Sequence, residues 1–102
     1  MKFYSVEISD QARRDILDLN DIIINFYKAP LTAKKYIKGL QDQIQKLETD
    51  SESYAVQTLK CLTQYGQNVR RLNYKKMAII YTVHQNTVLI HRVIPSNTIA
   101  GM

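Results

Sequence analysis

The sequence contains little cysteine, little glycine and no long apolar run. Cys61 is the single cysteine, which excludes an internal disulfide and a cysteine-rich metal site. Three glycines in the whole chain do not form a glycine-rich phosphate-binding loop. No apolar run is long enough for a membrane-spanning helix, and the first residues do not resemble a signal peptide. We therefore expect a cytoplasmic protein with a reduced thiol, no membrane partner, no metal and no other cofactor.

Acidic residues are scarce in the second half of the chain. Residues 1–50 carry eight basic and eight acidic side chains, whereas residues 51–102 carry six basic side chains and only Glu52 as an acid. The formal net charge of +5 therefore falls entirely in the second half. This asymmetry indicates an anionic partner, either nucleic acid or an acidic protein segment. The alternative is a basic surface that serves only solubility.

The first half of the chain predicts one strand and two helices. Alternating residues over 2–8 predict a short strand, and Ser9 or Asp10 can cap the helix that follows. Apolar residues then recur at spacings of four and three, which is typical of two amphipathic helices. These residues are Ala12, Ile16, Leu19, Ile23 and Phe26, followed by Ala33, Ile37, Leu40, Ile44 and Leu47. Pro30 separates the stripes and Thr32 can cap the second, so we expect an antiparallel helical hairpin.

The last third of the chain is rich in β-branched and aromatic residues, which favour strands. Three strands are predicted over 69–74, 77–84 and 88–94, with turns at 75–76 and 85–86. The stretch 49–66 predicts a loop, followed by a short helix or irregular chain. The order β-α-α-β-β-β predicts a single α+β domain over 1–102. In this fold the N-terminal helical hairpin packs on one face of a mainly antiparallel sheet.

Hairpin loops of two or four residues place the predicted strand residues on two faces, with Ile80 opposite His91. One face should meet the helices and carries Met77, Ile79, Tyr81, Val83, Val88, Ile90, Arg92 and Ile94. The other carries Arg71, Ala78, Ile80, Thr82, Leu89, His91 and Val93. No chain is left over to cover this second face, which is partly apolar and partly cationic. We therefore expect it to bind a partner.

Several segments resemble the RelE/ParE superfamily of bacterial toxins. Arg70 matches an arginine on the family's second strand, Tyr81 a tyrosine on the third, and Arg92-Val93 an arginine-valine pair on the fourth. The opening helix, from Ser9 to residue 19, is also similar to that of the family. The resemblance covers nearly the whole chain and implies a toxin of a type II toxin–antitoxin (plasmid stabilisation) system. A co-expressed antitoxin protein would neutralise it and form a hetero-oligomer with it.

The resemblance implies one of two targets. Toxins of the ParE type poison DNA gyrase, whereas those of the RelE type cut messenger RNA in the ribosome without a metal. Residues 94–102 lack the late histidine or tyrosine and the arginine of many RNA-cleaving members. We therefore expect a ParE-like toxin that inhibits growth by binding a macromolecular target such as DNA gyrase. One alternative is a ribosome-dependent mRNA endonuclease, and another is a toxin that only binds its antitoxin.

Two roles remain open for the basic residues of the last strands. In an RNA-cleaving toxin, His91 would exchange the proton while Arg71 and Arg92 clamp the phosphate. Otherwise His91 is a surface strand residue and the arginines hold an acidic antitoxin segment, which is the interpretation we favour. The residues expected to bind the target or the antitoxin are Arg70, Arg71, Lys75, Lys76, Ile80, Leu89, His91 and Val93. No metal ligands are expected.

Overall fold

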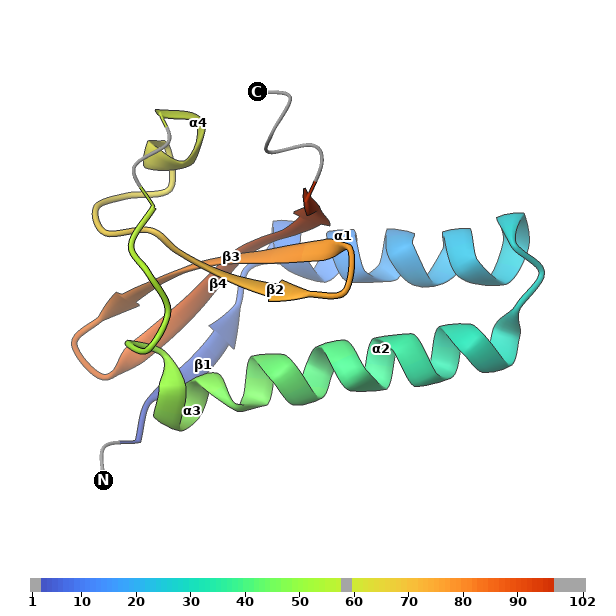
Figure 1. The fold of residues 1–102 in the computed structure, drawn as a ribbon, viewed down its shortest axis with the longest axis horizontal. Coiled ribbons are helices and arrows are strands. Elements are labelled where there is room, and N and C mark those ends of the chain that lie inside the picture. The colour runs from blue at the N-terminus through green and yellow to red at the C-terminus, as the bar shows by residue number, and fades with distance from the viewer. Residues whose placement is uncertain (1–2, 58–59, 97–102) are drawn as a thin grey trace.

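The fold is α+β, as the sequence predicts (Figure 1). A computed structural model describes residues 3–57 and 60–96, apart from the side chains of residues 60 and 61. The elements are β1 (Ser5–Ile8), α1 (Asp10–Asp21), the π-helix η1 (Ile22–Phe26), α2 (Pro30–Gln45), α3 (Leu47–Asp50), α4 (Lys60–Thr63), β2 (Arg70–Tyr74), β3 (Met77–His84) and β4 (Thr87–Pro95). The predicted order of one strand, two long helices and three strands is confirmed. Helix α3 occupies part of the predicted loop.

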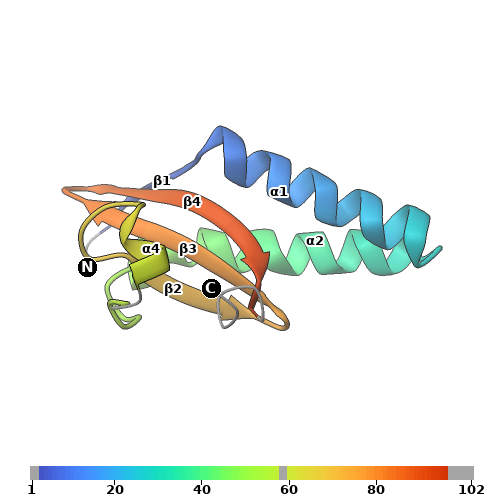
Figure 2. The ribbon, with the colours of Figure 1, turned by 90° about the horizontal axis from the view of Figure 1, so that it is seen from above.

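Helices α1 and α2 form the expected antiparallel hairpin, whose tip projects beyond the sheet (Figures 1 and 2). The hydroxyl of Ser9 accepts the backbone N–H of Ala12 at 3.0 Å and so caps α1. The chain turns at Lys28, whose φ of 54° lies in the left-handed region. Helix α2 begins at Pro30 and not after the expected cap Thr32, because a proline in the first turn leaves no N–H unsatisfied.

The four strands form one sheet in the order β1-β4-β3-β2. Strand β1 runs parallel to β4, whereas β4, β3 and β2 are antiparallel to their neighbours. Both predicted turns are confirmed, with residues 75–76 between β2 and β3 and residues 85–86 between β3 and β4. Lys75 and Gln85 adopt φ values of 53° and 55°, in the left-handed region that tight hairpins use.

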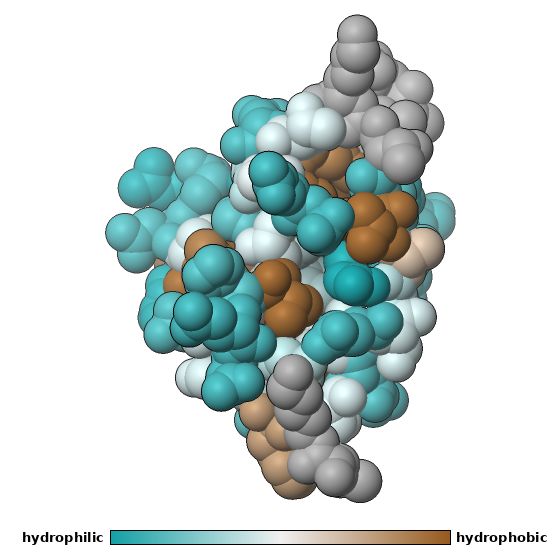
Figure 3. Space-filling view, turned by 90° about the vertical axis from the view of Figure 1, so that its left-hand side faces the viewer, coloured by the Kyte–Doolittle hydropathy of each residue, from teal (hydrophilic) through white to brown (hydrophobic). Residues whose placement is uncertain are grey.

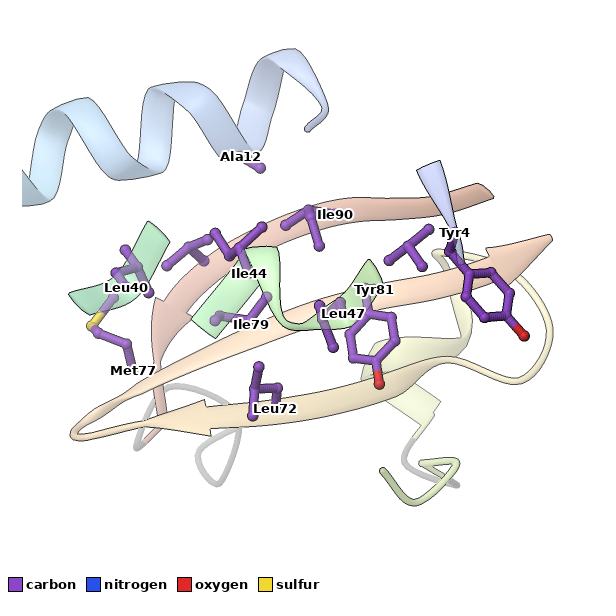
Figure 4. Packing of buried hydrophobic residues seen from close by; sticks show 12 residues of the cluster. Tyr4, Ala12, Leu40, Ile44, Leu47, Leu72, Met77, Ile79, Tyr81 and Ile90 are labelled. Carbon is purple, nitrogen blue, oxygen red and sulfur yellow. The ribbon is translucent and has the colours of Figure 1, made fainter. Parts of the chain in front are cut away.

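The sheet face that meets α2 and α3 carries the main core (Figure 4). The buried members of this core are Tyr4, Ala12, Leu40, Ile44, Leu47, Leu72, Met77, Ile79, Tyr81, Val88, Ile90 and Val93. Tyr81 is fully buried and donates its hydroxyl to the backbone carbonyl of Ser51 at 2.6 Å. Burial raises the pKa of the Tyr81 hydroxyl. This hydrogen bond ties β3 to the chain that leaves α3.

A β-bulge divides the hairpin of β3 and β4 into two halves of different register. Near the turn, Val83 pairs with Val88, as predicted. The register then shifts, so that Ile80 pairs with Arg92 and His91 is the extra residue of β4. The predicted pairing of Ile80 with His91 is therefore wrong.

The bulge exchanges the faces of the last residues of β4, because a slip of one residue turns each side chain to the opposite side. Val93 pairs with Ile79 and is only 2% exposed in the helix-side core. Arg92 and Ile94 pair with residues of the opposite face. The prediction that Arg92 and Ile94 face the helices and that Val93 faces a partner is wrong.

Part of the second face of the sheet is covered by the protein's own chain. Helix α4 and the residues that follow it lie over this face, on the side opposite α2 (Figures 1 and 2). A second buried cluster joins this segment to the sheet and comprises Leu62, Val69, Ala78, Ile80 and Ile94. The expectation of an uncovered face is wrong, because the stretch between α3 and β2 supplies an apolar cover.

Candidate functional site

The predicted partner-binding residues are only partly brought together. Those with accessible surface on the second face or at the β2–β3 turn are Arg71, Lys75, Lys76, Leu89 and His91. Ile80 is 0% exposed under the second cluster, and Val93 lies in the helix-side core. Because contact with a partner requires exposed atoms, Ile80 and Val93 are not part of a docking surface.

Arg70 lies on the opposite face of β2 from Arg71. It pairs with Tyr81 of the helix-side core. Its Nη1 donates to the backbone carbonyls of Tyr54 at 2.6 Å and of Glu52 at 3.2 Å. These charge-assisted bonds hold the loop after α3 against the sheet. Arg70 therefore binds the loop after α3 on the helix side of the sheet, and it does not lie beside Arg71.

Arg92 is held by an acid that sequence analysis did not single out. Arg92 donates from Nε and Nη2 to the two carboxylate oxygens of Asp15 on α1, at 2.7 and 3.1 Å. The same carboxylate accepts the backbone N–H of Val93 at 3.0 Å. The pKa of Arg92 is raised, mainly by the hydrogen bond to Asp15 and further by the Tyr65 hydroxyl. The predicted phosphate clamp is thus already paired within the fold.

His91 borders a groove between β3, β4 and the chain that follows α4. Its Nε2 lies 2.8 Å from the hydroxyl of Thr82, and the Tyr65 ring lies 5.4 Å away between centroids. Burial lowers the pKa of the imidazole, which is therefore mostly neutral near pH 7. The groove has a volume of about 410 Å³. Its lining residues are Tyr65, Gly66, Gln67, Asn68, Thr82, Val83, His84, Leu89 and His91.

Arg71 and Arg92 lie in one row across the second face. Arg71 pairs with Ile80, and Ile80 pairs with Arg92, so the backbones of the two arginines are two strand spacings apart, or about 10 Å. Arg71 donates from Nε to the side-chain oxygen of Asn73 at 2.8 Å. The three residues proposed for RNA cleavage therefore have separate partners, and His91 occupies the bulge beside this row.

Two adjacent exposed lysines, Lys75 and Lys76, lie at the β2–β3 turn, and Lys75 packs against two tyrosine rings. The Nζ of Lys75 lies 5.1 Å from the ring centroid of Tyr36 and 5.5 Å from that of Tyr74. The two rings meet edge to face at 5.2 Å. Burial and the neighbouring Tyr74 raise the pKa of Tyr36, which also bonds the backbone of Lys76. The sequence does not reveal this contact, since Tyr36 lies beside the apolar stripe of its helix and not on it.

Apolar side chains are exposed on the helical hairpin. Those on its outer side and at its tip are Leu17, Ile22, Phe26, Tyr27 and Leu31. A hollow of about 460 Å³ lies between α1 and α2, with Ile24 and Ile37 in its wall and Lys34 at its rim. The opposite end of the molecule is mostly hydrophilic, with separate hydrophobic patches (Figure 3). The exposed apolar residues of the hairpin are therefore a second surface suited to a protein partner.

The described part of the chain holds no group of three histidine, cysteine or acidic side chains that could bind a metal ion. Among the same residues, none of the helices has the length and apolar character needed to span a bilayer.

Comparison with known proteins identifies a family and a similar fold. Residues 6–99 match the family described as the ParE toxin of the type II toxin–antitoxin system parDE. The fold is similar to a solved chain of the chromosomal ParDE toxin–antitoxin system from P. aeruginosa, with a TM-score of 0.75. That match has 17% sequence identity and covers 91% of this chain and 96% of the other. No curated protein matches the sequence.

Proposed function

This chain belongs to the ParE toxin family of type II toxin–antitoxin systems, and on that premise we propose that it inhibits bacterial growth by binding DNA gyrase. A cognate antitoxin neutralises the toxin by forming a hetero-oligomer with it, and the pair serves plasmid stabilisation. In this proposal, the exposed Lys75 and Lys76, with the half-buried Arg71, meet an acidic surface of the target or of the antitoxin.

One observation carries this proposal: the side chains that RNA cleavage would require already form hydrogen bonds within the fold. Arg92 is paired with Asp15, Arg71 is bonded to Asn73, and His91 is bonded to Thr82. Cleavage of RNA needs a base, an acid and cations that converge on one phosphate. Side chains that are separately engaged favour inhibition by binding over inhibition by catalysis.

The competing hypothesis is ribosome-dependent cleavage of messenger RNA. One observation favours it: His91 opens onto a groove, and its lowered pKa leaves a neutral imidazole that can accept a proton. In that case induction of the toxin would create new transcript ends, whereas a gyrase-binding toxin would instead change DNA supercoiling.

A supercoiling assay with purified gyrase tests the proposed target. We expect the wild-type protein to inhibit supercoiling at micromolar concentration and Lys75→Glu/Lys76→Glu to inhibit roughly tenfold less, as loss of complementary charge does at interfaces. Arg13→Glu/Arg14→Glu is the matched control, because it reverses two adjacent exposed arginines on α1 that do not line the hollow of the helical hairpin. Full gyrase activity at saturating wild-type toxin would refute gyrase as the target.

Co-expression tests the proposed antitoxin. A short reading frame beside the toxin gene, with an acidic second half, is the candidate partner. We expect its product to restore growth and to copurify with the toxin in a complex that weakens as salt rises. Growth arrest that persists despite copurification would contradict neutralisation, and normal growth with the toxin alone would contradict toxicity.

A further inference from the structure

The groove beside His91 has the features of a ligand site, and the proposed action on gyrase does not use it. We propose that this groove binds an unpaired base of a single-stranded nucleic acid, with the base stacked against Tyr65 and His91. The inference depends on the groove alone and holds whichever macromolecule the toxin inhibits.

The shape and the walls of the groove suit a flat ring. Its volume of about 410 Å³ lies within the usual range for small-ligand sites. The rings of Tyr65 and His91 are tilted by 34° at a centroid distance of 5.4 Å, so they contact each other and together form an aromatic wall against which a base can stack. Leu89 adds an apolar contact from β4. Aromatic side chains of this kind bind bases of any sequence, because every base has a π-face.

The polar groups of the groove suit an uncharged ligand. Among the side chains that the structure describes, no lysine, arginine, aspartate or glutamate lines it, whereas Gln67 and Asn68, which carry side-chain amides, do. Thr82 holds Nε2 of His91, and Nδ1 forms no hydrogen bond with any residue that the structure describes. Amide, hydroxyl and neutral imidazole groups can donate to and accept from the edge of a base. A carboxylate or phosphate would find no counter-ion among the described residues that line the groove.

A cation lies on the same sheet face as the groove, where a sugar-phosphate backbone would run. Arg71 is half-buried there and bonds the neutral side chain of Asn73. The charge of Arg92, which lies beside the Tyr65 hydroxyl, is instead offset by Asp15. The second half of the chain also holds the whole net charge. Neutral groups inside and cations outside are the arrangement by which single strands bind, with bases on aromatic rings and phosphates on basic side chains.

Titration of the full-length protein tests the inference, with oligothymidylate and oligouridylate of about ten nucleotides and with the nucleosides thymidine and uridine. We expect the oligonucleotides to bind and to shift the NMR signals of Gly66, Thr82 and His91. Tyr65→Leu should lower the affinity roughly tenfold, whereas Tyr65→Phe, which keeps the ring, should retain it. Tyr27→Leu is the control, because it removes an equally aromatic but distant side chain at the hairpin tip.

Each outcome decides the inference. Nucleoside shifts at the same residues support the site and show that no phosphate is needed, and the stronger of the DNA and RNA titrations identifies the nucleic acid. Absence of binding by every probe overturns the inference, and so does binding that leaves the groove signals unchanged. If Tyr65→Leu does not fold, the shifts of the wild-type protein and the affinity of Tyr65→Phe still decide it. These results are independent of the gyrase assay, so the two proposals fail separately.

Discussion

Asp15 and Arg92 join the first helix to the last strand by a two-point ion pair, with Arg92 Nε 2.7 Å from Asp15 Oδ2. Strand β1 pairs with β4 only as far as Ile90, which leaves the following edge of β4 without a neighbouring strand. At this edge the Asp15 carboxylate accepts the N–H of Val93, in place of a carbonyl from a neighbouring strand. One carboxylate therefore continues the edge pairing of the sheet and neutralises a guanidinium.

Replacing this carboxylate should destabilise the protein. Asp15→Ala leaves the N–H of Val93 and the Arg92 guanidinium without their acceptor, and we expect a loss of about 2 kcal/mol in the free energy of unfolding. Urea denaturation measures this change. Asp18→Ala is the control, since Asp18 is exposed on the same helix and its loss should change stability by less than about 0.5 kcal/mol. Equal effects of the two substitutions would contradict the role given to Asp15.

Replacing Gly39 with alanine should destabilise the protein, although alanine favours helices. A Cβ at this position would overlap the hydroxyl of Tyr74, which lies across α2. In an exposed helix interior the same change stabilises by about 1 kcal/mol, whereas here we expect Gly39→Ala to lower the melting temperature. In the background of Tyr74→Leu the loss should shrink or reverse, which a double-mutant cycle measures. The same loss in both backgrounds would show that Tyr74 is not the obstacle.

The buried hydroxyl of Tyr81 predicts a loss of stability in alkali. Burial raises its pKa in the folded protein above the ordinary value of 10.0. Its contribution is therefore fully present below about pH 10 and is lost as the pH rises further, because the unfolded chain ionises first. Tyr81→Phe should lose about 1 kcal/mol at neutral pH, since the Ser51 carbonyl loses its donor. Its stability should fall less steeply than that of the wild type above about pH 10. Parallel alkaline curves would contradict this account.

His91 predicts the opposite pH dependence at the acid end. Burial lowers its pKa below the ordinary value of 6.5, so the unfolded chain binds a proton before the folded one does. Stability should therefore fall as the pH drops from about 7 to about 5. His91→Gln keeps a hydrogen-bonding group beside Thr82 but cannot titrate, so it should reduce this fall in denaturation curves at the two pH values. An NMR signal of His91 that titrates above pH 6.5 in the folded protein would rule out this explanation.

The sequence predicts the four strands, the two long helices and the turns because each leaves a local pattern. Alternation and four-three spacing give the strands and helices, and the even loop at residues 85–86 gives the pairing of Val83 with Val88. The bulge at His91 leaves no such pattern, because it depends on how β4 meets α1 after β1 ends. One extra residue there was enough to reverse the predicted faces of Arg92 and Val93.

The covered second face could not be predicted for a similar reason. Residues 54–66 have no clear periodicity, so the pattern gave no indication that Leu62 packs with Val69 over Ile80. The candidate groove depends on the same segment, since Tyr65 reaches His91 only when this chain folds back over the sheet. Sequence analysis did select His91, because a histidine on a basic strand is a recognisable feature, but it could not identify the neighbours.

Mapping transcript ends after induction of the toxin in growing cells tests most directly whether it acts by binding and not by cutting RNA. We expect growth to stop without new ends at codon-spaced positions, and with the same transcript profile for His91→Gln as for the wild-type protein. Codon-spaced ends that appear with the wild type and disappear with His91→Gln would contradict the proposed mechanism and establish RNA cleavage instead.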